Sequence, residues 1–305
     1  MLPFKLVYHP GYDLNLGDHV FPSKKFRLIH DRLLEEGFAA PGDFIEPEPA
    51  SDADLQLVHE EGWVRRLKTG TLGYRELAKL EIPYSPEMTR AFWLAAGGSI
   101  LAARAALEDG IGFNIGGGFH HAFSDHGEGF CAIHDVAVAI RKMQQEGRIK
   151  RAMVIDCDVH QGNGTAGIFA GDPSVFTFSI HQFNNYPTDK PPSTCDIHLP
   201  DGVKDEEYLQ HMEGFCARAM AAFAPEMVFY VAGADPYFDD QLGGLSLTIA
   251  GLKRRDRLVM ETALAHKAPV VVTLAGGYAN DINDTVAIHC NTAKTAQETL
   301  VAQSR

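Results

Sequence analysis

The chain has 305 residues, of which 45% are hydrophobic and 22% charged, a composition typical of a soluble globular protein. Its net charge of −13 argues against a nucleic-acid partner, because no basic stripe is available to neutralise phosphates. No apolar run of about 18 residues, no signal peptide and no CxxC pair are present, so we expect a cytoplasmic protein without membrane spans or disulfides.

Apolar, β-branched runs alternate with amphipathic or alanine-rich stretches along the chain, which indicates a mainly parallel sheet covered by helices. We predict strands at residues 5–9, 112–115, 152–156, 175–181, 227–232 and 270–274. We predict helices at residues 26–36, 86–109, 134–146, 205–223, 251–266 and 280–303. Ser85 and Pro86 are typical of a helix start. Because neither a linker nor a repeat interrupts the pattern, we predict one three-layer α/β domain over residues 1–305.

The residues with the clearest chemical potential each follow the end of a predicted strand. The carboxyl ends of parallel strands lie at one edge of a sheet, where α/β proteins place ligand sites. Residues that are far apart in the sequence are therefore expected to meet there. The sequence predicts one site formed by the following side chains: His120, His121, Asp158, Asp235 and Tyr278.

Asp156, Asp158 and His160 are spaced by two, so an extended chain would turn all three side chains the same way. Carboxylate and imidazole ligands suit Zn²⁺, Mn²⁺ or Fe²⁺, and we assign Asp158, His160 and Asp235 as ligands. This set leaves one position open for water, as in catalytic sites. Tyr278 is expected to donate to a carbonyl oxygen that the metal polarises. Alternatively, the aspartates cap a helix while His160 and Tyr278 pack in loops.

Three glycines at residues 116–118 precede the adjacent His120 and His121, and they allow the backbone to turn closely beneath a ligand. Two neighbouring imidazoles can serve a metal-activated water and a leaving amine as base and acid, provided that their pKa values differ. Asp156 is expected to keep one ring protonated, and Asn163 to orient the other without adding charge. On its own, the histidine pair would indicate an exposed loop.

Several blocks of the sequence together resemble the zinc-dependent histone deacetylase family of the arginase/deacetylase superfamily. They are GGGFHHA (116–122), DCDVHQGNGT (156–165), GAD (233–235), DQLGGLSLT (240–248) and AGGY (275–278). The resemblance covers nearly the whole chain and is closest to class IV and bacterial histone deacetylase-like proteins. It implies the arginase/deacetylase fold, with a central, mainly parallel eight-stranded sheet flanked by helices.

The resemblance also implies a role for each matching residue. Asp158, His160 and Asp235 match the zinc ligands. His121 matches the general base, and His120, beside Asp156, matches its protonated partner. Tyr278 matches the tyrosine that binds the substrate carbonyl. The resemblance assigns the acyl-lysine tunnel to Gly129 and Phe130 on one wall, Tyr186 on the facing wall and Leu242 near the rim. It places a structural potassium ion beside the backbone of Asp156, Asp158 and His160, with Ser179 and Ile180.

Three features depart from the family pattern. Asn163 replaces the aspartate that class I members place beside the second histidine, so we expect a less basic His121 and a slower reaction. Gln161 stands where many members have another histidine. Residues 182–200, which we predict to be the longest irregular stretch, match no class I pattern. The preferred length of the acyl chain is therefore left open.

We expect a zinc-dependent hydrolase that removes acetyl or longer acyl groups from N-acylated lysine in proteins or peptides. The main alternative is an acetylpolyamine or other small acylated amine as substrate. The acidic net charge would favour such a cation, but acidity also keeps proteins soluble, and no entrance insertion is evident. A metal-retaining binding module without activity is a third interpretation. A two-manganese, arginase-like hydrolase is a fourth, and it would need further carboxylates near Asp156 and Asp235.

Overall fold

The computed structural model describes residues 1–303, whose strands form an eight-stranded sheet with parallel pairing throughout. The strands follow the order β2-β1-β3-β8-β7-β4-β5-β6 across the sheet. They are β1 (Lys5–Val7), β2 (Phe44–Ile45), β3 (Ile111–Asn114), β4 (Ala152–Asp156), β5 (Val175–Gln182), β6 (Cys195–Leu199), β7 (Met227–Val231) and β8 (Val270–Thr273). The predicted mainly parallel α/β sheet is therefore confirmed.

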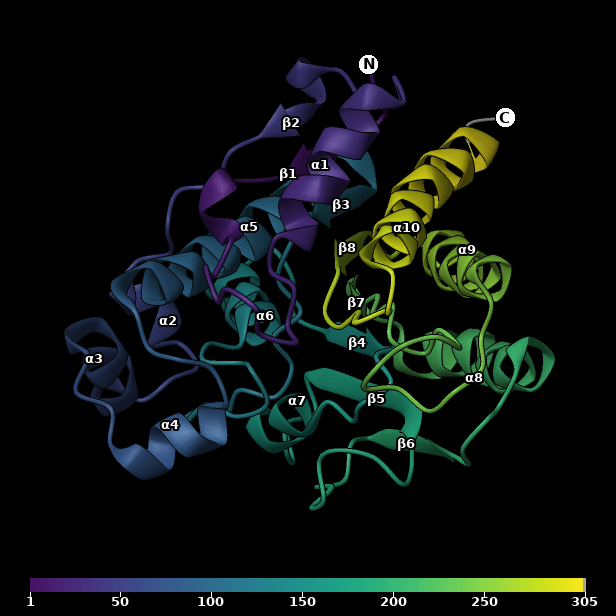
Figure 1. Cartoon of the computed structure of the whole chain (residues 1–305). Helices are drawn as coiled ribbons and strands as arrows, with labels where there is room; N and C mark the ends of the chain where they lie inside the picture. Colours follow the sequence, from purple (N-terminus) through teal and green to yellow (C-terminus); the bar gives the residue numbers. More distant parts are fainter. Residues whose placement is uncertain (304–305) are drawn as a thin grey trace.

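Helices cover both faces of the sheet and give the molecule three layers (Figure 1). One layer contains α1 (Lys25–Glu35), α8 (Asp205–Phe223), α9 (Ile249–Ala265) and α10 (Ile282–Gln303). The opposite side carries α2 (Asp52–Leu55), α3 (Glu61–Thr69), α4 (Tyr74–Leu80), α5 (Pro86–Asp109), α6 (Asp135–Gln145) and α7 (Asn163–Ile168). Within residues 1–303, none of these helices has both the length and the apolarity that crossing a membrane requires.

The central strands are buried on both faces, which explains their continuous apolar runs. Every residue of β3, β4, β7 and β8 is buried. The alanine-rich helix α5 packs closely on this sheet, and a Cβ added to Gly112 would lie 1.9 Å from the carbonyl oxygen of Ala102. The start of α5 is as predicted, because the Ser85 hydroxyl accepts a hydrogen bond of 2.9 Å from the backbone N–H of Met88.

The sequence did not reveal the two edge strands, β2 and β6. The prediction that residues 182–200 are irregular is wrong at its end, because Cys195–Leu199 forms β6 and pairs with β5. Four of the five residues of β6 are partly or fully exposed, so its side chains lack the apolar run of a central strand. Its extended conformation depends on the hydrogen bonds that β5 offers, which no local pattern records.

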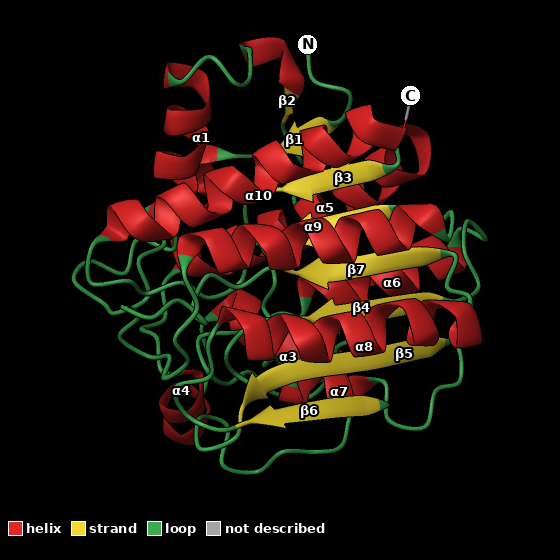
Figure 2. Ribbon diagram, turned by 90° about the vertical axis from the view of Figure 1, so that its right-hand side faces the viewer, coloured by secondary structure: helices red, strands yellow, loops and turns green. Residues whose placement is uncertain are grey.

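The carboxyl ends of the strands lie at one edge of the sheet, where long loops gather (Figure 2). Strands β3, β8, β7 and β4 are direct neighbours in the sheet. The loops that follow these four strands therefore begin side by side, although they are distant in the sequence. This arrangement brings together the loops that carry His120, His121, Asp158, Asp235 and Tyr278.

Candidate active site

The loop after β3 presents the two histidines, and a buried carboxylate holds it in place. Gly117 and Gly118 adopt φ angles of 69° and 82°, which side-chain-bearing residues rarely adopt. Asp135, in the first turn of α6, accepts hydrogen bonds from the backbone N–H groups of Gly118 (3.0 Å) and Phe119 (2.8 Å). Asp135 was not predicted, because an acidic residue at a predicted helix start usually serves the N–H groups of its own helix.

The two imidazoles have different partners and therefore different proton affinities. His120 Nδ1 lies 2.6 Å from Asp156 Oδ2, and His121 Nδ1 lies 2.7 Å from Asn163 Oδ1. Burial disfavours the charged form of His120, but Asp156 and Asp158 outweigh it and raise the pKa of His120 to about 9. Burial lowers the pKa of His121 well below its usual range, and the charge of His120 lowers it further. One ring is therefore cationic and the other neutral near pH 7.

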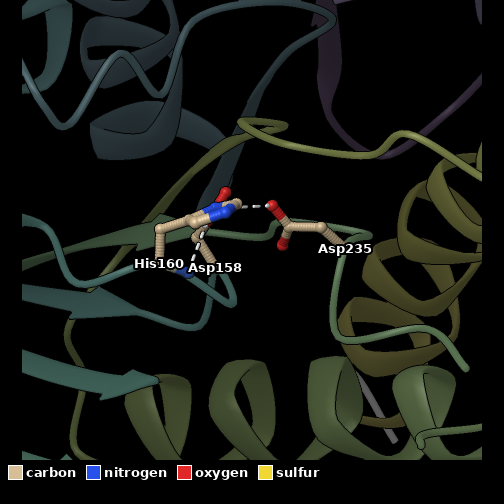
Figure 3. Close-up of side chains that lie close together, drawn as sticks. All are labelled: Asp158, His160 and Asp235. Carbon is tan, nitrogen blue, oxygen red and sulfur yellow. Dashed lines mark hydrogen bonds and ion pairs between the residues drawn. The ribbon is translucent and has the colours of Figure 1, made fainter. Parts of the chain in front are cut away.

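Asp158 and His160 follow β4, Asp235 follows β7, and their side chains converge (Figure 3). Their potential ligand atoms all lie within 4.8 Å of one another, and all three residues are buried. His160 Nδ1 lies 3.0 Å from Asp158 Oδ1 and 3.3 Å from Asp235 Oδ2. The backbone bends at residues 158–160, so the condition under which all three side chains would face the same way is not met. Asp156 pairs with one of the two histidines, as expected, and that histidine is His120.

This cluster has the properties of a cation site. Asp158 Oδ2 accepts a hydrogen bond from the N–H of Gly276 (2.9 Å), and Asp235 Oδ1 accepts one from Val159 (2.8 Å). Among the described residues, the buried Oδ2 of Asp235 has no partner in hydrogen-bond geometry, although His160 Nδ1 lies 3.3 Å away. Burial and the neighbouring Asp158 raise the pKa of Asp235 to about 7. A divalent cation would satisfy Asp235 Oδ2 and balance the two carboxylates, so the donor set fits Zn²⁺.

Tyr278 lies beside this cluster, in the loop after β8, and a second buried carboxylate fixes its backbone. Asp240 accepts hydrogen bonds from the N–H groups of Tyr278 (2.7 Å), Leu242 (2.9 Å) and Gly243 (2.9 Å). Burial raises the pKa of the Tyr278 phenol well above its usual range, so the hydroxyl remains a donor. Asp240 opens the DQLGG motif, but its role was not predicted.

A cavity of about 160 Å³ opens beside these groups. The residues that line it are Glu81, His121, Gly129, Phe130, His160, Asn185, Tyr186, Leu242 and Tyr278. All four residues predicted for the substrate tunnel are among them. Asn185 was not predicted, and it joins two sides of the cavity because its Nδ2 donates to the carbonyl oxygen of Leu242 at 2.8 Å. Gln161, a departure from the family pattern, donates to the carbonyl oxygen of Pro191 at 2.8 Å and so anchors the segment that carries Tyr186.

Arg255 on α9 bridges the two loops that carry Asp158 and Asp235. Its buried guanidinium donates to the carbonyl oxygens of Cys157 (3.2 Å) and Gly233 (2.7 Å) and pairs with Asp256 at 2.8 Å. Cys157 directly precedes Asp158, and Gly233 lies two residues before Asp235. No sequence signal indicated this arginine, because charged residues on a helix are usually exposed.

Comparisons with known proteins agree with this geometry. A model of the histone deacetylase domain matches residues 19–293. An uncharacterised protein of Picosynechococcus sp. is 42% identical over 296 residues, covering 97% of this chain and 99% of that protein. Histone deacetylase 2 of Arabidopsis thaliana is 32% identical over 286 residues, covering 90% and 74%. The crystal structure of the HDA15 HD domain superposes with a TM-score of 0.82 at 26% identity, covering 97% and 89%.

Proposed function

Because this chain belongs to the histone deacetylase family and is a hydrolytic deacetylase, we propose that it removes acyl groups from the side chain of lysine with one zinc ion. The observation that carries this proposal is the buried trio of Asp158, His160 and Asp235, of which His160 lines a cavity together with His121 and Tyr278. Since all described strands belong to one sheet, we infer a single catalytic domain.

The cation and the surrounding side chains have separate tasks. Zn²⁺ held by Asp158, His160 and Asp235 would polarise the amide carbonyl and lower the pKa of a water molecule. Neutral His121 accepts a proton from the attacking water at Nε2, because its Nδ1 faces an amide oxygen, and it later returns a proton to the leaving amine. The hydroxyl of Tyr278 donates a hydrogen bond to the carbonyl oxygen as negative charge develops there.

The other residues of the site support this reaction. His120, kept cationic by Asp156, stabilises negative charge next to the base. Phe130 and Tyr186 give the cavity apolar walls that suit the methylene chain of lysine, and the Tyr186 ring lies 4.9 Å from the His121 ring. We also propose a structural potassium ion beside the backbone of the residues that follow: Asp156, Asp158, His160, Ser179 and Ile180. The pairing of Asp156 with Ser179 across adjacent strands supports it.

The proposal is tested with acetyl-lysine peptides and the zinc-loaded protein. We expect activity that a chelator abolishes and that falls by about 100- to 1000-fold in Tyr278→Phe, because one hydrogen bond to the developing oxyanion is lost. Tyr74→Phe is the matched control, since Tyr74 is 87% exposed and its substitution leaves the site intact. Undiminished turnover in Tyr278→Phe would contradict the scheme, and a content of two metals per chain would favour a two-metal hydrolase.

A small acylated polyamine is the second candidate substrate. The exposed carboxylate of Glu81 lines the cavity and could attract a cationic chain. We compare kcat/KM for acetylspermidine and acetyl-lysine peptides in the wild type and in Glu81→Gln. A preference for acetylspermidine that disappears in the variant would favour the polyamine. Lysine acyl chains from acetyl to myristoyl then define the acyl length that the cavity accepts.

A further inference from the structure

Asn163 lies between the proposed base and a carboxylate that the reaction scheme does not use. On one side its Oδ1 is 2.7 Å from His121 Nδ1. On the other side its Nδ2 donates to Glu128 Oε1. Asn163 is 2% exposed and the side chain of Glu128 is 13% exposed, so water competes little for these contacts. The three side chains form a chain of ring, amide and carboxylate.

The chemistry of Glu128 dictates how the amide must point. An asparagine amide has an acceptor end and a donor end of nearly equal shape, whereas a carboxylate only accepts hydrogen bonds. The NH₂ group therefore faces Glu128, and the oxygen faces His121. That oxygen requires a proton on Nδ1, and a neutral imidazole with its proton on Nδ1 has its lone pair on Nε2. The reversed amide would favour the opposite tautomer, which has no lone pair where a base must accept a proton.

We propose that Glu128 is a positioning residue, which fixes the direction of the Asn163 amide and thereby the reactive tautomer of His121. This inference rests on the proposed function, because it assumes that His121 is the base. It also gives a reason for the departure at position 163. An aspartate at position 163 would place its negative charge directly beside the His121 ring. In this chain the charge belongs to Glu128, and the Asn163 amide lies between that carboxylate and the ring.

The surroundings of Glu128 keep it ionised and in place. Lys79 Nζ lies 3.2 Å and His126 Nε2 lies 3.4 Å from its Oε2. Burial raises the pKa of Glu128, but the hydrogen bonds from His126, Asn163 and Lys79 outweigh it and lower the pKa to about 2. Backbone hydrogen bonds between Glu128 and Cys131, at 3.1 and 2.9 Å, close the turn that carries the carboxylate.

The test is a double-mutant cycle on the zinc-loaded enzyme with an acyl-lysine peptide. Glu128→Gln keeps the shape but can donate as well as accept, so the amide direction is no longer fixed. We expect kcat to fall by about 10- to 100-fold with KM changed less than about twofold, the usual loss when a supporting partner is removed. In an Asn163→Asp background no amide needs orienting, and the same Glu128→Gln change should leave kcat unchanged or raise it. An equal loss in both backgrounds would mean a merely structural role.

A spectroscopic measurement decides the inference without any substrate. The ¹³Cδ2 and ¹⁵N shifts of His121 in the metal-free protein, assigned by comparison with His121→Ala, report which nitrogen carries the proton. We expect Nδ1–H in the wild type and in Glu61→Gln, the same change at a carboxylate that is 78% exposed, and a mixture in Glu128→Gln at unchanged Tm. An unchanged tautomer in Glu128→Gln would overturn the inference. Inactivity of the wild type on every acyl substrate would instead refute the proposed function.

Discussion

Replacing Arg255 with methionine tests how far the fold depends on the charge balance of the buried ion pair behind the site. Arg255 and Asp256 are both buried, and the guanidinium also donates to the carbonyl oxygens of Cys157 and Gly233. Methionine fills much of the volume but leaves Asp256 charged without its cation. Removing one partner of a buried pair typically destabilises a protein by about 3–5 kcal/mol, because the remaining charge is uncompensated. We expect a loss of that size in the free energy of unfolding.

The assay is urea unfolding of the metal-free protein, followed by circular dichroism, with zinc affinity measured by chelator competition. Zinc affinity should also fall, because methionine cannot donate to the carbonyl oxygens of Cys157 and Gly233, and the loops that carry the proposed ligands lose this connection. The double variant Arg255→Met, Asp256→Asn removes the stranded charge and should recover part of the stability. Arg254→Met on the same helix is the control, since Arg254 and its partner Glu206 are exposed and the substitution should change nothing measurable. A loss below about 1 kcal/mol in Arg255→Met, or no recovery in the double variant, would refute the reasoning.

Two further substitutions test buried positions elsewhere. Burial lowers the pKa of His59 from 6.5 to about 4, so the neutral ring contributes full stability above pH 6.5 and that stability is lost as the pH falls towards 4. Between pH 6.5 and 4 the unfolding free energy of the wild type should fall by about 3 kcal/mol more than that of His59→Gln, because each pKa unit corresponds to about 1.36 kcal/mol. Parallel curves of unfolding free energy against pH for the two proteins would contradict this. In Gly276→Ala the new Cβ would lie 1.9 Å from Asp235 Oδ2, so zinc binding measured by calorimetry should be lost, whereas Gly42→Ala, with open space around it, should bind zinc normally.

Much of the sheet could be predicted from local sequence, because its central strands are buried on both faces. The apolar runs that mark β4, β7 and β8 leave little choice of conformation, and the residues that follow them are fixed by chain connectivity. Asp158 and Asp235 could therefore be assigned to one site, since neighbouring parallel strands end at the same edge. Strand β6 could not be predicted, because its exposed residues become extended only by pairing with β5.

The supporting contacts of the site required the tertiary structure. Asp156 and Asp158 look equivalent in the sequence, yet a bend after β4 directs one to His120 and the other to the cation site. Nothing local indicated that Arg255 is buried, or that Glu128 reaches Asn163 from 35 residues away. Residue types and strand ends determined which chemistry this chain carries. Packing decided which atoms of these groups form hydrogen bonds with one another. Such contacts depend on the distances between loops, and only the assembled sheet sets those distances.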